Sequence, residues 1–231
     1  MIKAVFFDLY QTLVRYDPPR EQIIAATLGE FGIEVKPEQF VGPLVAADEF
    51  IYQSMARRPL GQQSSEERMA LYIRHLEILF EKAGITVEPS LIPKMLMGMQ
   101  ESNSSMVLFD DVIPTLDDLK NRGIILGLIS NIDTDMTDTL RGLGLDTRLN
   151  VVMTSREAGV TKPKPEIFLA ALKKAGVSAG DSLFIGDQYE IDVAGAQAAG
   201  MTGILLDRTG FYTSITDCPR ITGLAEVTDY L

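Results

Sequence analysis

Short, largely apolar segments that contain or run into a polar or acidic residue at their carboxyl end recur along this chain. They are Lys3–Leu9, Ile124–Ile129, Ser182–Ile185 and Gly203–Leu206, with Val151–Thr154 as a fifth, shorter candidate. Continuous hydrophobicity over so few residues is typical of strands buried on both faces, as in a parallel sheet. The pattern therefore predicts the strands of a parallel sheet.

Helical patterns that stop at a glycine alternate with these strands. They cover Ile113–Arg122, Met136–Arg141, Pro165–Ala175 and Ile191–Ala199, each followed directly by a glycine. Strands that alternate with helices imply βαβ crossovers, with helices on both faces of the sheet. We therefore expect an α/β fold with a doubly wound parallel sheet.

Residues 15–105 carry a different pattern. They show helical periodicity over Arg20–Phe31, Pro37–Ala56, Ser64–Lys82 and Glu88–Gln100, and no convincing buried strand. The first strand is thus followed by an inserted helical unit before the α/β pattern resumes. We expect residues 1–14 and 106–231 to form one unit and residues 15–105 a second.

The composition is that of an ordinary globular chain with an acidic balance. Of its 231 residues, 46% are hydrophobic, and 21 basic against 32 acidic residues give a formal net charge of −11. This charge would repel phosphate backbones, so we expect no nucleic-acid partner. The single cysteine, Cys218, excludes an internal disulfide and fits a reducing cytoplasm. No segment approaches the roughly 18 apolar residues of a membrane helix, so we expect a cytoplasmic protein without membrane contact.

The only histidine, His75, lies in an amphipathic helical pattern. We expect it to face solvent from that helix. A single histidine also argues strongly against a histidine-based catalytic triad or a metal site built from several histidines.

Polar and acidic residues gather at the carboxyl ends of the expected strands. Asp8 ends the first, Ser130 and Asn131 follow the second, and Asp187 follows a later one, with Asp192 five residues on. The active crevice of an open α/β sheet lies beyond these ends, so Asp8 and Asp187 would meet there. Two carboxylates repel each other unless a cation lies between them, and hard oxygen ligands suit Mg²⁺. Taken singly, each residue also has a structural explanation as a turn or a helix cap.

In their order along the chain, these residues resemble the motifs of the haloacid dehalogenase-like hydrolase superfamily. The segment Asp8-Leu9-Tyr10-Gln11-Thr12 matches the first motif, Asp-x-Asp-x-Thr/Val, with one departure. Ser130 matches the second motif, Lys162 followed by Pro163 the third, and Asp187 with Asp192 the fourth. The insertion is similar to the family's α-helical cap. The resemblance thus implies a Rossmann-like catalytic core at 1–14 and 106–231 and a cap at 15–105.

The resemblance also implies a role for each matching residue. Asp8 would be the nucleophile that forms a covalent aspartyl intermediate, and Lys162 would pair with Asp8 and with the developing charge. Asp8, the Tyr10 carbonyl and Asp187 would hold Mg²⁺, with Asp192 as a ligand or an outer support. The residues expected to contact an anionic small-molecule substrate are Tyr10, Thr12, Ser130 and Asn131.

Tyr10 is the departure from the first motif. Phosphatases of the family carry an aspartate there, which protonates the leaving oxygen and then activates water. A phenol with a pKa of about 10 is poorly matched to that task near neutral pH, and general acid–base catalysis is worth about 10²–10⁴-fold. Gln11 likewise replaces the usual small residue. Asp133 offers another carboxylate after the second motif, but we expect it to cap the following helix.

A tyrosine at position 10 resembles the 2-haloacid dehalogenase branch of the superfamily, whose leaving halide needs no proton. That branch needs no metal and has a serine where this chain has Asp187 and an asparagine where it has Tyr189. Asp187 would repel a haloacid carboxylate if no cation were bound. The chain therefore combines a dehalogenase-like first motif with a phosphatase-like fourth motif.

Three functions remain open at this point. The leading one is a Mg²⁺-dependent phosphatase acting on a small phosphorylated metabolite, which Asp187 and Asp192 favour. The alternatives are a metal-independent 2-haloacid dehalogenase, in which Asp8 displaces halide, and a non-catalytic binding protein on a hydrolase scaffold. Neither the substrate nor the oligomeric state is encoded in a pattern of this sequence.

Overall fold

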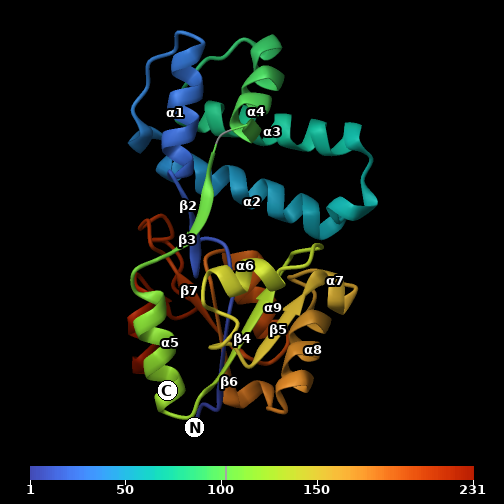
Figure 1. The fold of residues 1–231 in the computed structure, drawn as a ribbon, viewed down its shortest axis with the longest axis vertical. Helices are drawn as coiled ribbons and strands as arrows, with labels where there is room; N and C mark the ends of the chain where they lie inside the picture. Colours follow the sequence, from blue (N-terminus) through green and yellow to red (C-terminus); the bar gives the residue numbers. More distant parts are fainter. Residues whose placement is uncertain (102) are drawn as a thin grey trace. The chain divides into compact units, whose positions relative to one another are not determined.

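The structure is a computed structural model that describes residues 1–101 and 103–231. The chain divides into two compact units (Figure 1). Unit 1 consists of Met1–Arg15 and Val107–Leu231, and unit 2 of Tyr16–Met106. Their roles as catalytic core and cap remain predictions.

Unit 1 is built on a six-stranded sheet with the order β5-β4-β1-β6-β7-β8, and its strand pairs are parallel. The strands are β1 (Ala4–Phe7), β4 (Ile125–Ser130), β5 (Val151–Thr154), β6 (Ser182–Gly186), β7 (Thr202–Leu206) and β8 (Arg220–Ile221). Phe7, the last residue of β1, lies opposite Leu128 and Ile185, so the three central strands end within two residues of one another at the same edge of the sheet. The predicted sheet is confirmed, with the addition of β8, which is too short to leave a pattern.

Helices cover both faces of this sheet. They are α5 (Val112–Asn121), α6 (Thr137–Gly142), α7 (Ser155–Ala158), α8 (Pro165–Ala175) and α9 (Ala194–Ala198). Figure 1 shows α5 and α8 on opposite sides of the strands. The predicted doubly wound α/β fold is therefore confirmed.

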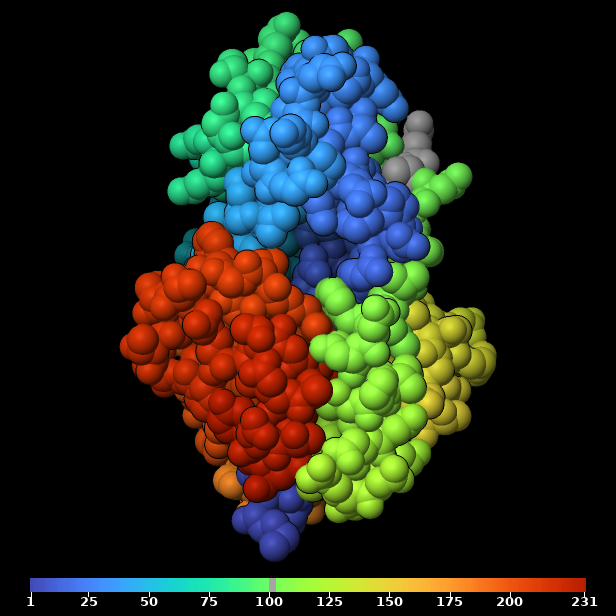
Figure 2. All heavy atoms as spheres, turned by 90° about the vertical axis from the view of Figure 1, so that its left-hand side faces the viewer, coloured from blue at the N-terminus to red at the C-terminus, as the bar shows by residue number. Residues whose placement is uncertain are grey.

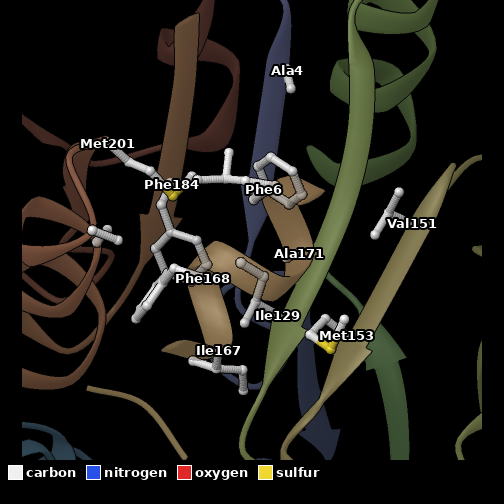
Figure 3. Packing of buried hydrophobic residues seen from close by; sticks show 13 residues of the cluster. Ala4, Phe6, Ile129, Val151, Met153, Ile167, Phe168, Ala171, Phe184 and Met201 are labelled. Atoms are coloured by element: carbon white, nitrogen blue, oxygen red, sulfur yellow. The ribbon is translucent and has the colours of Figure 1, made fainter. Parts of the chain in front are cut away.

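The core between the sheet and α8 contains three phenylalanines among aliphatic side chains (Figure 3). Phe6 and Phe184 come from neighbouring strands, and Phe168 comes from α8. The rings of Phe168 and Phe184 meet edge to face, with their centroids 5.1 Å apart. This packing fixes α8, and with it the turn that precedes α8.

The C-terminal segment of unit 1 packs against the helix that follows the return from unit 2. The 3₁₀ helix η6 (Leu224–Tyr230) contacts α5, and the two segments lie side by side in red and light green in Figure 2. Leu224, Val227, Leu116 and Leu119 are buried there.

Unit 2 is helical, as expected. Its helices are α1 (Arg20–Glu30), α2 (Val41–Arg57), α3 (Ser65–Ala83) and α4 (Ile92–Glu101), with 3₁₀ turns η1 (Pro37–Phe40), η2 (Leu60–Gln62) and η3 (Pro89–Leu91). Ser64 and Glu67 form a capping box that starts α3, and Gly84 in the left-handed conformation ends it. No helix in the described part of the chain is long and apolar enough to span a bilayer.

Two short strands escaped the sequence analysis. β2 (Val14–Asp17) and β3 (Ser105–Leu108) form a separate two-stranded sheet, and the boundaries of the two units fall within these strands. Most of their residues are at least partly exposed. They therefore lack the continuous apolar run by which buried strands are recognised.

The expectation that His75 faces solvent is wrong. His75 is buried on α3, and its Nε2 lies 3.0 Å from Oδ1 of Asp48 on α2. Arg20 donates to both oxygens of the same carboxylate, at 2.6 and 2.7 Å. The buried partner comes from another helix, so the pattern of α3 alone could not show it.

Candidate active site

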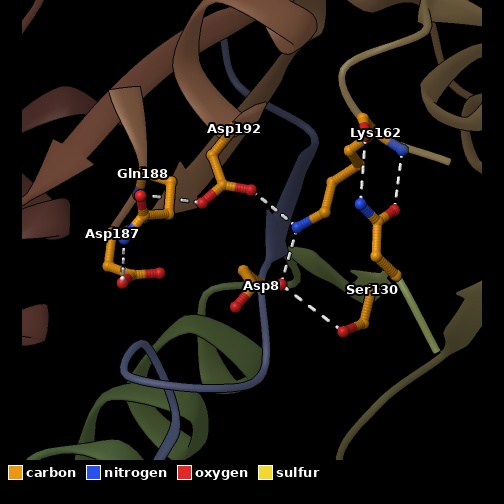
Figure 4. A network of polar contacts seen from close by, with 7 residues as sticks. Asp8, Ser130, Lys162, Asp187, Gln188 and Asp192 are labelled. Atoms are coloured by element: carbon orange, nitrogen blue, oxygen red, sulfur yellow. Dashed lines mark hydrogen bonds and ion pairs between the residues drawn. The ribbon is translucent and has the colours of Figure 1, made fainter. Parts of the chain in front are cut away.

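A buried lysine joins two carboxylates near the carboxyl ends of β1 and β6 (Figure 4). The Nζ of Lys162 lies 2.6 Å from Oδ1 of Asp8 and 2.6 Å from Oδ1 of Asp192. Burial by itself lowers the pKa of Lys162, but the charges of Asp192 and Asp8 outweigh burial and raise that pKa above its ordinary value. Lys162 is therefore a fixed cation that orients the Asp8 carboxylate.

Asp192 lies in the π-helical turn η5 (Tyr189–Val193) and is 1% exposed. Burial raises the pKa of Asp192 to about 6; the Lys162 cation opposes this rise and the Asp8 charge adds to it. Its second oxygen, Oδ2, accepts a hydrogen bond from the Gln188 main-chain nitrogen at 3.0 Å. Both oxygens thus accept a hydrogen bond, and Asp192 holds Lys162 in place. Its role as a metal ligand remains a prediction.

Asn131 clamps the main chain of Lys162. Its Oδ1 accepts from the Lys162 nitrogen at 2.7 Å, and its Nδ2 donates to the Lys162 carbonyl at 3.0 Å. Both ends of the amide are used in this way, so Asn131 positions Lys162. Its expected contact with a substrate remains a prediction. Ser130, the last residue of β4, donates to Oδ1 of Asp8 at 3.5 Å, the outer limit for a hydrogen bond.

Gly186 makes room for Asp192. A Cβ at position 186 would lie 2.3 Å from both Cγ and Oδ2 of Asp192. The close approach of the Asp192 carboxylate to the end of β6 therefore requires glycine. Asp187, the next residue, is half-buried, and its Oδ2 accepts from Nε2 of Gln188 at 3.0 Å.

Three carboxylates converge at this edge of the sheet. Asp8, Asp187 and Asp192 each offer an oxygen, and these oxygens lie within 4.8 Å of one another. Carboxylates this close together repel one another, and a divalent cation between them would relieve that repulsion. The donors are all hard oxygens, as Mg²⁺ prefers, so the residues fit that ion.

The remaining predicted residues lie on the loop that follows β1. Tyr10 is half-buried and forms a β-bridge with Val14. Thr12 is fully buried, and its hydroxyl has no hydrogen-bond partner among the described residues. The Thr12 hydroxyl is closed to solvent in this conformation, and its expected contact with a substrate remains a prediction.

The expectation that Asp133 caps the following helix is wrong. Asp133 is exposed, and the carboxylate of Asp135 accepts instead from the main-chain nitrogen of Thr137, the first residue of α6, at 2.9 Å. The helix begins beyond the reach of Asp133. Gln188, which donates to Asp192 from its main chain and to Asp187 from its side chain, was missed. Neither contact leaves a mark in the sequence, because each depends on the folded conformation of this turn.

Comparison with known proteins gives consistent matches. A family model described as haloacid dehalogenase-like hydrolase matches residues 2–200. The ribulose-1,5-bisphosphate 5-phosphatase of Halopiger xanaduensis is 30% identical, covering 90% of this chain and 85% of its own. The glyceraldehyde 3-phosphate phosphatase of Methanopyrus kandleri is 29% identical, with coverages of 90% and 85%. The crystal structure of a 2-haloacid dehalogenase from Pseudomonas syringae pv. tomato DC3000 is 27% identical, with a TM-score of 0.56 and coverages of 99% and 97%.

Proposed function

The chain belongs to the haloacid dehalogenase-like hydrolases, and from that premise we propose that it is a Mg²⁺-dependent phosphatase acting on a small phosphorylated metabolite. The observation that carries the proposal is the convergence of oxygens from Asp8, Asp187 and Asp192 within 4.8 Å of one another, beside the buried Lys162. Relatives named as phosphatases of small phosphorylated compounds support it. A metabolite of this kind agrees with the cytoplasmic location expected from the sequence.

We assign the chemistry to unit 1. Asp8, Ser130, Lys162, Asp187 and Asp192 all lie in it, so unit 1 is the catalytic core of the proposal and unit 2 its cap.

Asp8 is the proposed nucleophile. Its Oδ1 is held by Lys162 and Ser130, while its Oδ2 has no hydrogen-bond partner among the described residues (Figure 4). A carboxylate oxygen attacks phosphorus, and the bond from phosphorus to the leaving oxygen breaks. Water then attacks the aspartyl phosphate, which releases phosphate and restores the carboxylate. When bound, Mg²⁺ supplies charge neutralisation between the carboxylates and the phosphoryl group.

Lys162 and Tyr10 set the limits of this chemistry. The fixed ammonium of Lys162 stabilises the charge that develops on the phosphoryl oxygens. Tyr10 stands where the family's phosphatases carry their general acid, so the leaving oxygen departs with little protonation. Substrates with leaving groups of low pKa, such as aryl or acyl phosphates, should therefore react best.

The test is hydrolysis of p-nitrophenyl phosphate with Mg²⁺ or with EDTA, run beside chloride release from 2-chloropropionate. We expect Mg²⁺-dependent phosphate release that Asp8→Asn abolishes, because the amide keeps the shape of the carboxylate and removes its nucleophilicity. Asp181→Asn, which alters a surface ion pair with Lys3, is the control and should retain the rate.

Three other outcomes of this experiment would contradict the phosphatase proposal. Chloride release without metal would establish the 2-haloacid dehalogenase that Tyr10 and the 27% identical dehalogenase structure favour. If the protein releases neither phosphate nor chloride, it is a binding protein on a hydrolase scaffold. An undiminished rate in Asp8→Asn would exclude the covalent mechanism.

A further inference from the structure

Arg208 follows the end of β7 and contacts both segments through which the chain leaves and re-enters unit 1. Its Nη2 donates to the Thr12 carbonyl at 3.0 Å, two residues before β2 begins. Its guanidinium centre lies 4.0 Å from the ring centroid of Phe109, the residue directly after β3. One side chain therefore ties together the outgoing and the returning segment.

Asp111 fixes the guanidinium in this position. Nη1 and Nη2 of Arg208 each donate to one oxygen of the Asp111 carboxylate at 2.9 Å, and the Leu224 main-chain nitrogen donates to it at 2.8 Å. Burial raises the pKa of Asp111, but the hydrogen bonds from Arg208 and Leu224 outweigh burial and bring that pKa below its ordinary value. The Asp111 carboxylate therefore stays charged at neutral pH, and the planar fork of Arg208 has a geometry that a lysine cannot reproduce.

The loop that Arg208 contacts carries the first motif and needs support. Gln11 has a φ of 61°, in the left-handed region that disfavours residues with a Cβ. The turns of the loop are closed by its own hydrogen bonds, from Gln11 to Val14 and from Leu13 to Leu9. Such a conformation persists only where the surrounding structure holds it.

The loop is held to the rest of unit 1 at its two ends. At its start, the Asp8 nitrogen donates to the Ile185 carbonyl at 2.9 Å, as part of the sheet. At its far end, Arg208 donates to Thr12, and the Phe109 nitrogen donates to the Leu13 carbonyl at 3.1 Å. Tyr10 lies between these two points of attachment.

We propose that Arg208 is a positioning residue for the active site, which holds the loop from Asp8 to Val14 in its working conformation by anchoring Thr12 and Phe109. The hydrogen bonds of Arg208 go to Asp111 and to the Thr12 carbonyl, so it acts on the loop through the main chain of Thr12. The catalytic part of this inference rests on the proposed phosphatase function, whereas the anchoring of the loop does not.

The test compares Arg208→Lys with Arg148→Lys. Arg148 is a matched control in unit 1, because it donates to both oxygens of Asp117, at 2.8 and 3.2 Å, and to the Gly144 carbonyl at 2.8 Å. Each substitution thus removes a carboxylate fork and a main-chain contact, but only that of Arg208 bears on the loop. Amide hydrogen exchange is followed in residues 9–16 and 107–112, and kcat and KM are measured on p-nitrophenyl phosphate.

Arg208→Lys should speed exchange in both segments and lower kcat by about 10- to 10²-fold, since displacement of a reacting group by about 1 Å costs about 10²-fold. KM should change much less than kcat, because the substrate-binding groups are retained. Arg148→Lys should show neither effect.

Three results would overturn the inference: unchanged exchange in Arg208→Lys, faster exchange without loss of kcat, or equal losses in the two variants. If the wild-type protein hydrolyses no phosphate ester, the proposed function fails, and exchange alone decides whether Arg208 orders the loop. If Arg208→Lys does not fold, Phe109→Leu removes the stacked ring, keeps the hydrogen-bonding groups, and should move both readouts in the same direction.

Discussion

Replacement of Gly186 by alanine tests the steric basis of the acidic cluster. The new Cβ would lie 2.3 Å from Cγ and 2.5 Å from Cβ of Asp192, and Asp192 is 1% exposed, so it has no free space to enter. Overpacking of this kind costs about 1–3 kcal/mol, and loss of a buried ion-pair partner costs about 3–5 kcal/mol. Because the displaced carboxylate would also weaken its contact with Lys162, we expect a loss of about 3 kcal/mol or more in the free energy of unfolding.

The assay is urea denaturation in EDTA, supported by thermal unfolding. For a chain of this length, 3 kcal/mol corresponds to a fall in Tm of roughly 6–12 °C. Gly180→Ala is the control, because a Cβ at Gly180 meets nothing within 4 Å. In an Asp192→Gly background, which removes all three crowded atoms, Gly186→Ala should cost less than about 1 kcal/mol.

Two results would refute this reasoning. One is a Gly186→Ala variant whose free energy of unfolding stays within about 1 kcal/mol of the wild type. So small a loss is typical of substitutions at uncrowded surface positions and would contradict the crowding by Asp192. The other is an undiminished cost in the Asp192→Gly background, which would place the clash elsewhere.

Three further predictions address the metal, the leaving group and pH. Asp187→Asn should abolish the rise in Tm that Mg²⁺ gives the wild type, a stabilisation of about 2.7 kcal/mol at a hundredfold excess over Kd; an equal Mg²⁺ response in the variant would exclude the site. Tyr10→Asp should raise the rate on alkyl phosphates by up to about 10²-fold in steady-state assays, because it restores a general acid; a variant that binds Mg²⁺ and hydrolyses no phosphate ester would contradict the assignment. Burial raises the pKa of Asp48, but Arg20 and His75 outweigh burial and hold that pKa below its ordinary value of 3.8. Since a depressed pKa contributes stability above 3.8 that is lost as the pH falls, the stability advantage of the wild type over Asp48→Asn in urea denaturation should shrink below about pH 4, and a constant difference would refute the ion pair.

The sequence by itself determined the sheet, the helical insertion and the family. Strands buried on both faces of a parallel sheet are apolar along most of their length, so a few residues suffice to identify β1, β4 and β6 in the sequence. The meeting of Asp8 and Asp187 followed as well, because residues after the ends of adjacent parallel strands share one edge of a sheet. These features depend only on local composition and on the geometry of parallel pairing.

The partners of the individual side chains were decided only in the tertiary structure. Lys162 was expected beside Asp8, but its second carboxylate, Asp192, and the clamp by Asn131 were not. His75 was expected at the surface, whereas it is buried and contacts the Asp48 carboxylate on another helix. No role was predicted for Arg208, since its main-chain acceptor at Thr12 has no signature in a sequence. A periodic pattern records which face of an element is apolar, whereas a hydrogen bond depends on which groups the packed elements bring within about 3 Å of each other.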